Sequence, residues 1–170
     1  AIGAGAFVDI NAVWWAARPD SSEIPLTTRE NGLESDALRL VGEFGWTEVE
    51  MAPEAASDPV LGALGERPLA FHYHYDTFDL PASAVLLGTT DGIKEAYRIG
   101  KAAWATQFHP EVGLAQMLAW FSTYRASYER KGVDVDEQIA LSHQNWMRYR
   151  KQAIDLATAF AAQVKQHANN

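Results

Sequence analysis

The sequence predicts an α/β protein in which short strands come first and amphipathic helices close the chain. An aromatic-rich strand is expected at residues 68–76 and a hairpin at residues 95–108, and apolar residues recur every three or four positions from residue 113 onward. The length of 170 residues fits one domain, and a hydrophobic content of 48% is enough for a sizeable core. We therefore expect residues 1–170 to form a single α/β domain.

The N-terminal part of the sequence mixes short strand signals with turn chemistry. Residues 7–10 are expected to form a short strand and residues 11–18 a helical turn. No element is assigned to residues 19–36, which are polar and rich in turn residues. Residues 45–51 alternate polar and apolar side chains, which predicts a half-buried strand, and residues 53–64 are expected to form a short helix.

Strand and helix signals become clearer in the second half of the chain. Residues 84–88 form a short apolar run. The stretches 95–99 and 103–108 are joined by Gly-Lys, which predicts two strands of a hairpin. Residues 113–131 are expected to form a helix that ends before Gly132. Asp134 is expected to cap a final long helix that reaches about residue 166.

Composition excludes several classes of function. The net charge of -8 argues against a protein that binds nucleic acid through phosphate contacts. The sequence shows neither an apolar run of membrane-spanning length nor a secretory signal, so we expect a cytoplasmic protein. It contains no cysteine, which excludes disulfides, cysteine-ligated zinc and thiolate chemistry for these 170 residues.

A histidine and a glutamate stand at the end of the second strand of the expected hairpin. The stretch 103–108 is followed by His109, Pro110 and Glu111. Because Pro110 has a fixed φ and lacks an N–H, it ends the strand and holds His109 in an extended conformation. Open α/β sheets place their chemistry at such strand ends. An imidazole beside a carboxylate is the base-and-orienter half of a nucleophilic triad, so His109 and Glu111 are candidate catalytic residues.

Three segments resemble, in the right order, the signatures of one enzyme family. They are residues 42–46 (Gly-Glu-Phe-Gly-Trp), residues 71–81 (Phe-His-Tyr-His-Tyr-Asp-Thr-Phe-Asp-Leu-Pro) and residues 107–111 (Gln-Phe-His-Pro-Glu). Together they are similar to class I glutamine amidotransferases, and the first segment is similar to the GMP-synthase-like branch of that family. The resemblance covers about residues 42–170.

The resemblance implies a three-layer, flavodoxin-like domain, whose N-terminal part is expected to be short or remodelled in this chain. It also implies hydrolysis of the side-chain amide of glutamine by a Cys-His-Glu triad, with His109 as the base and Glu111 as its orienter. The residues implied in substrate binding are Tyr73, His74, Tyr75 and Asp76. Since the chain has no cysteine to act as nucleophile, we expect it to be inactive or impaired in this reaction.

Two alternatives remain open beside an impaired amidotransferase. The chain could be a non-catalytic scaffold that binds a small molecule or a protein. It could also be a metal-binding hydrolase, because His72, His74 and Asp76 would share one face of a strand. The amidotransferase interpretation expects no cofactor and no metal. Its expected partners are a glutamine-like small molecule and either a synthetase or a second copy of the chain, with no nucleic acid and no membrane.

Overall fold

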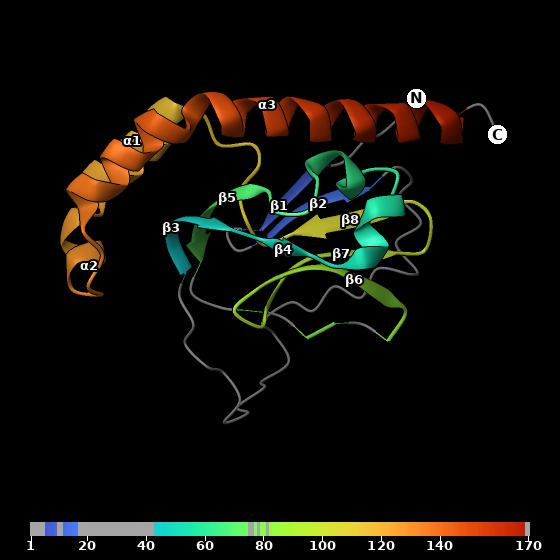
Figure 1. Cartoon of the computed structure of the whole chain (residues 1–170), viewed down its shortest axis with the longest axis horizontal. Coiled ribbons are helices and arrows are strands. Elements are labelled where there is room, and N and C mark those ends of the chain that lie inside the picture. Colours follow the sequence, from blue (N-terminus) through green and yellow to red (C-terminus); the bar gives the residue numbers. More distant parts are fainter. Residues whose placement is uncertain are drawn as a thin grey trace.

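The strands of the protein form two antiparallel sheets with helices packed beside them (Figure 1). This computed structural model describes residues 6–9, 12–16, 43–74, 77, 79–80 and 82–168. A six-stranded sheet has the order β1-β2-β8-β7-β6-β4, and a second sheet pairs β3 with β5. The strands are β1 (Ala6–Asp9), β2 (Ala12–Ala16), β3 (Glu43–Glu48), β4 (Glu50–Met51), β5 (Leu69–His74), β6 (Ala84–Thr90), β7 (Ile93–Ile99) and β8 (Ala103–Thr106). The expected α/β class is confirmed.

The helical turn predicted for residues 11–18 is wrong, because Ala12–Ala16 forms strand β2. This strand pairs with β1 on one side and with β8 on the other, and Trp15 lies opposite Trp104 in the β8 ladder. Valine and tryptophan both favour strands, and two neighbouring strands supply partners for the backbone. The strand predicted at residues 7–10 is confirmed as β1. Residues 19–36 lie outside the described residues.

The strand predicted at residues 45–51 exists, but it is shared between the two sheets. Its first part, β3, pairs with β5, and its last two residues, β4, pair with β6. Val49 lies at the change of sheet, where its N–H donates to the carbonyl of Pro68 at 3.0 Å. Because Val49 is fully buried, this crossing point also anchors the core between the sheets.

The predicted hairpin of residues 95–108 is confirmed as the antiparallel pair β7 and β8. Another hairpin joins β6 to β7, and its turn places Asp91 and Gly92 at φ values of 47° and 84°. The short helix expected at residues 53–64 is instead a pair of 3₁₀ helices, η2 (Pro53–Ser57) and η3 (Leu61–Leu64).

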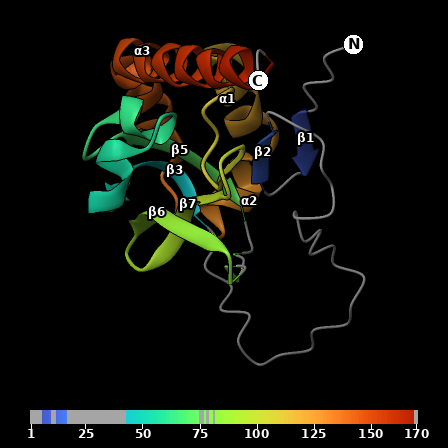
Figure 2. The ribbon, with the colours of Figure 1, turned by 90° about the vertical axis from the view of Figure 1, so that its right-hand side faces the viewer.

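α-Helices pack against two parts of the strands: one long helix runs along one side, and two shorter helices lie at one end beside β3 (Figures 1 and 2). They are α1 (Leu114–Thr123), α2 (Arg125–Glu129) and α3 (Val135–Ala168). The single helix expected at residues 113–131 is interrupted at Tyr124. The caps follow expectation, because Gly132 has a φ of 80° and the side chain of Asp134 accepts the N–H of Glu137 at 3.0 Å.

Two apolar cores hold these layers together. One lies between the six-stranded sheet, the 3₁₀ helices and the C-terminal half of α3, and it contains Trp104, Leu156 and Phe160. The other lies between β5 and all three helices, and it contains Phe71 and Phe121. Among the described residues, no helix combines the length and the apolar character needed to cross a membrane.

Candidate active site and the polar cluster beside it

His109 is held on both sides of its backbone. It follows β8 by three residues, and its N–H donates to the carbonyl of Phe71 in β5 at 2.9 Å. Its own carbonyl accepts the hydroxyl proton of Tyr149, a buried residue of α3. Burial and the nearby Glu111 carboxylate raise the pKa of Tyr149, so the hydroxyl keeps the proton that it donates. The backbone of His109 is therefore fixed by one strand and one helix.

The side chains of His109 and Glu111 meet as the sequence predicts. His109 Nδ1 lies 2.9 Å from Glu111 Oε1, and the two side chains are 5% and 34% exposed. Since a carboxylate only accepts hydrogen bonds, Nδ1 is the donor, and the lone pair of the neutral ring falls on Nε2. Nε2 is buried and has no hydrogen-bond partner among the described residues. The edge-on ring of Trp120, 5.5 Å away between centroids, packs against the imidazole.

The two described members of the predicted substrate-binding set lie on opposite faces of β5. Tyr73 faces the helices, where its ring packs against Trp120 at 5.0 Å and against Tyr128 at 5.6 Å between centroids. His74 is completely buried on the other face, and its Nδ1 lies 2.8 Å from Nε2 of Gln107. Tyr75 and Asp76 lie outside the described residues. The structure therefore does not bring Tyr73 and His74 to a common surface.

Four ionisable side chains form a polar cluster on the inner face of β5, and we call Glu43, His72, His74 and Glu95 the His–Glu cluster. One ligand-type atom from each lies within 4.8 Å of those from the other three. His74 Nε2 is 3.2 Å from Glu43 Oε2, and His72 Nδ1 is 3.6 Å from Glu95 Oε2. His72, His74 and Glu95 are at most 1% exposed.

Burial controls the charges in this cluster. Burial, together with the Glu43 carboxylate, raises the pKa of Glu95 to about 10. Burial also lowers the pKa of His72 to about 4, although Glu43 opposes this shift. Burial acts to raise the pKa of Glu43, but the adjoining His74 and Glu95 side chains outweigh it and lower that pKa. At neutral pH the cluster thus holds a protonated Glu95, a neutral His72 and an ionised Glu43.

Sequence reasoning missed both glutamates of the cluster. Glu43 stands in the segment 42–46, which served only as a marker of the fold. Glu95 is the third residue of β7, between Lys94 and Ala96, and the local sequence does not show that this carboxyl is buried. The glutamates become visible as a set only when β3 and β7 are placed beside β5.

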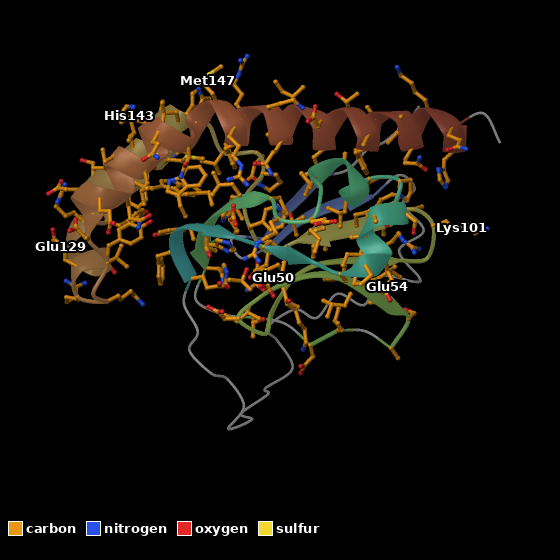
Figure 3. The ribbon with its side chains drawn as sticks, in the orientation of Figure 1. Glu50, Glu54, Lys101, Glu129, His143 and Met147 are labelled. Atoms are coloured by element: carbon orange, nitrogen blue, oxygen red, sulfur yellow. The ribbon has the colours of Figure 1, made fainter. Side chains whose placement is uncertain are left out.

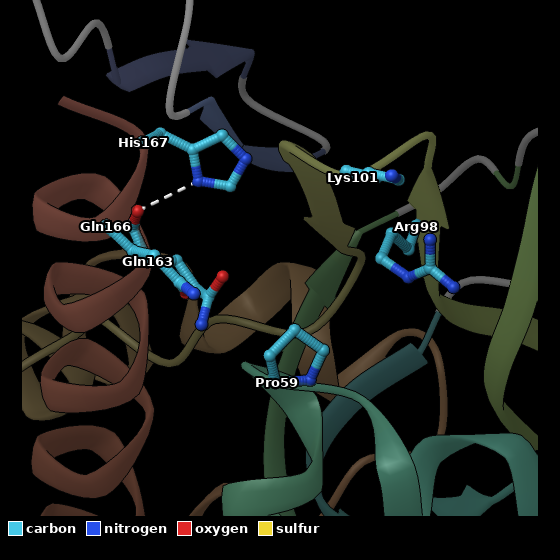
Figure 4. Close-up of a pocket in the computed structure, with 6 residues that line it drawn as sticks. All are labelled: Pro59, Arg98, Lys101, Gln163, Gln166 and His167. Atoms are coloured by element: carbon cyan, nitrogen blue, oxygen red, sulfur yellow. Dashed lines mark hydrogen bonds between the residues drawn. The ribbon is translucent and has the colours of Figure 1, made fainter. Parts of the chain in front are cut away.

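A separate cavity of about 380 Å³ opens at the C-terminal end of α3 (Figure 4). Neither His109 nor any member of the His–Glu cluster lines it. The lining residues are Pro59, Arg98, Lys101, Gln163, Gln166 and His167. Because the Arg98 guanidinium is already bound to Asp58 at 2.9 Å, the cavity does not present an unpaired cation from this residue.

Comparison with solved structures identifies the type of fold. A glutamine amidotransferase from Thermotoga maritima is 26% identical over 75% of this chain and 53% of its own, with a TM-score of 0.61. A glutamine amidotransferase from Methylobacillus flagellatus is 20% identical over 72% of this chain and 53% of its own, with a TM-score of 0.50. The chain spans about half the length of the structures that it matches. It matches no protein-family model and, at a significant level, no curated protein sequence. The mixed α/β fold is thus of the glutamine amidotransferase, flavodoxin-like type.

Proposed function

We propose that this chain is a class I glutamine amidotransferase-like protein of the GMP-synthase-like branch, impaired in glutamine hydrolysis, whose 170 residues form one domain. The observation that supports it most is the 2.9 Å contact between His109 Nδ1 and Glu111 Oε1, which leaves the buried Nε2 without a partner among the described residues. That arrangement is the base and the orienter of a triad. The likeness to two solved amidotransferase structures adds independent support.

In the proposed site, each member of the pair has a separate task. Glu111 accepts the Nδ1 proton of His109, fixes the tautomer and stabilises the imidazolium that forms when Nε2 takes up a proton. Tyr149 and Phe71 hold the backbone of His109, so that the ring keeps its direction. Such support matters because a displacement of about 1 Å can cost a catalytic site roughly 100-fold in rate.

The missing step is nucleophilic attack. Amide hydrolysis by a triad needs an atom that bonds to the carbonyl carbon while the base takes its proton, and this chain contains no cysteine. His109 could still accept a proton from water. Without a covalent intermediate, however, the difficult step is not divided into two easier ones, and so we expect ammonia release from glutamine at the background rate.

A glutamine-like small molecule is the ligand that we propose for the site. We place it near Nε2 of His109 and keep residues 73–76 as the segment that shapes its binding. His74 acts there through Gln107, since the Gln107 amide lies 2.8 Å from His74 Nδ1. A synthetase or a second copy of the chain is proposed as the protein partner.

Two assays on the full chain test this proposal. Ammonia release from L-glutamine is measured for the wild type, for His109→Ala and for buffer alone, and all three rates should agree. Calorimetric titration with L-glutamine should then detect binding to the wild type and a loss of at least 10-fold in affinity for His109→Ala. Glutamine turnover by the wild type would refute the proposed impairment. Equal affinity of the wild type and His109→Ala for glutamine would show that the ligand does not bind at His109.

The alternative of a non-catalytic scaffold is favoured by the absence of cysteine. It differs from our proposal in the position of its ligand. Saturation-transfer NMR with L-glutamine and Glu111→Gln separates the two, because this change keeps the shape of residue 111 but weakens its hold on His109. Binding that is insensitive to both His109→Ala and Glu111→Gln would support the scaffold.

A further inference from the structure

The His–Glu cluster lies at the joint between the two sheets. Glu43 and His74 are directly opposite each other in the β3–β5 ladder, so their side chains share one face. His72 precedes His74 by two residues and lies on the same face of β5. Glu95 comes from β7 of the six-stranded sheet, where its carbonyl accepts the N–H of Gln107 at 2.7 Å. Two sheets thus direct four ionisable groups toward one point.

His72 is buried without a hydrogen-bond partner for its ring. Among the described residues, neither ring nitrogen of His72 has such a partner, and the protonated Glu95 carboxyl adjoins the Glu43 carboxylate. Both side chains are at most 1% exposed. Leaving a buried polar group unsatisfied is costly, and buried charges in proteins are normally paired or coordinate metals. The two unpartnered ring nitrogens of His72 therefore indicate that something else completes this site.

The spacing fits a metal ion. A tetrahedral zinc ion with ligands at its usual bond lengths has neighbouring ligand atoms about 3.3–3.5 Å apart. The two measured contacts, 3.2 Å for Glu43 with His74 and 3.6 Å for His72 with Glu95, bracket that range. Because the ligand atoms all lie within 4.8 Å of one another, the widest separation needs to shrink by no more than about 1.5 Å. We infer that Glu43, His72, His74 and Glu95 bind one divalent transition-metal ion, with zinc as the preferred ion.

Charge and ligand type support this choice of ion. A metal ion bound by Glu95 would displace the proton that this carboxyl holds in the metal-free protein. With both carboxylates then ionised, the four ligands carry a charge of -2, which a divalent cation neutralises inside the protein. Imidazole nitrogen suits zinc, copper, nickel and iron, whereas magnesium and calcium prefer sites made of oxygen alone. The Glu43 side chain is 13% exposed, so one ligand reaches solvent and gives the ion a route into the site.

Gln107 provides the second layer that such a site needs. Metal-bound histidines usually donate their other ring N–H to an acceptor, which fixes the orientation of the ring. Exchanging the oxygen and nitrogen positions of the Gln107 amide would let its oxygen accept from His74 Nδ1–H. The Thr77 hydroxyl, 3.3 Å from the Gln107 side chain, could then accept from the amide instead of donating to it. His74 Nε2, which lies 3.2 Å from Glu43 Oε2, would then bind the ion together with that carboxylate.

This inference replaces the metal set considered from the sequence and revises the expectation of no metal. Both sets contain His72 and His74, but Glu43 and Glu95 take the place of Asp76, which lies outside the described residues. The inference also goes beyond the proposed function, because His109 and Glu111 bind each other and take no part in the site. A metal here would join the two sheets whether or not the chain binds glutamine.

Zinc binding by the full chain tests the inference. Protein freed of metal with a chelator is titrated with zinc chloride in a calorimeter, alongside His72→Gln and Glu95→Gln. Exposed His143, which points away from the sheets (Figure 3), gives the matched control His143→Gln, and His109→Gln tests the neighbouring pair. We expect one zinc per wild-type chain. We also expect a loss of at least 100-fold in affinity for the two cluster variants and no change for the two controls.

Two measurements on the wild type keep the test decisive if a cluster variant fails to fold. Zinc X-ray absorption should show two imidazoles and additional oxygen ligands at about 2.0–2.1 Å. Zinc at 100 times its Kd should raise the melting temperature by roughly 5–10 °C. A spectrum without two imidazoles, a stoichiometry well below one, or binding that survives both cluster substitutions would overturn the inference.

Discussion

Asp58 joins the 3₁₀ helices to the six-stranded sheet through four hydrogen bonds. Its Oδ1 accepts the backbone N–H groups of Val60 and Leu61 at 2.9 and 2.8 Å and the indole N–H of Trp104 at 3.0 Å. Its Oδ2 accepts Nε of Arg98 at 2.9 Å. The residue is only 7% exposed, so water cannot easily replace these donors.

Asp58→Asn keeps the shape of this side chain but turns one acceptor into a donor. If the amide oxygen keeps the Oδ1 position, the new NH₂ group faces Nε of Arg98 and one charge-assisted hydrogen bond is lost, worth about 1.5–3 kcal/mol. The other orientation would leave three donors without an acceptor and costs more. Since the remaining bonds also lose their charge assistance, we expect the free energy of unfolding to fall by about 2–4 kcal/mol.

Urea unfolding followed by circular dichroism measures this difference. Asp91→Asn is the matched control, because Asp91 is exposed and its φ of 47° suits asparagine equally well. The control should stay within about 0.5 kcal/mol of the wild type. If Asp58→Asn also stayed within that limit, the four hydrogen bonds would not be the link between these elements.

Three further predictions concern single side chains. Tyr149→Phe removes the donor to the His109 carbonyl and should lower the free energy of unfolding by about 1–3 kcal/mol in urea. Gly45→Ala should lower it by about 1–3 kcal/mol, because the φ of Gly45 is 95°, which alanine rarely adopts, and because the added Cβ would overlap Oε1 of Gln138. The hydrogen bond from Arg148 lowers the pKa of Glu48. The depressed pKa stabilises the protein above the unfolded-state value near 4.5, and this contribution is lost as pH falls through the folded-state value. The difference in urea midpoint between wild type and Glu48→Gln should therefore be present at neutral pH and shrink as the pH falls below 4.5.

Each of these predictions has its own control or contrary outcome. Tyr124 is 45% exposed, so Tyr124→Phe should leave stability unchanged where Tyr149→Phe does not. Gly92 has a φ of 84° with open space around it, so Gly92→Ala reports the cost of the backbone alone. A larger loss for Gly92→Ala than for Gly45→Ala would contradict the prediction. A Glu48→Gln difference that is independent of pH, or that persists in high salt, would contradict the ion pair as its source.

Much of the fold follows from local sequence patterns. Two strand-like stretches joined by Gly-Lys predicted the hairpin of β7 and β8. Gly132 predicted where the preceding helix ends, and Asp134 predicted where the last helix begins. The error at residues 11–18 has a physical reason, because the strand exists through its pairing with β8, which is about 90 residues away in the sequence. The interruption at Tyr124 was not predicted, because apolar residues keep the helical spacing across it.

From the sequence, only the part of the candidate site that is formed by residues close together in the chain could be predicted. His109 and Glu111 are two residues apart, so their contact follows from a short segment held at both ends. The His–Glu cluster combines β3, β5 and β7, and its assembly depends on which face of each strand turns inward. Glu95 shows this most clearly, because its carboxylate meets His72 only when β7 of one sheet is placed beside β5 of the other.

The most direct test of the proposed function is the tautomer of His109 and its response to ligand. Long-range ¹H–¹⁵N NMR of the histidine rings, assigned with His109→Ala, reports which nitrogen carries the proton. We predict protonated Nδ1, unprotonated Nε2 and a shift of the Nε2 resonance when L-glutamine is added. A proton on Nε2 instead of Nδ1, or an Nε2 resonance that stays unchanged while glutamine binds, would contradict the account.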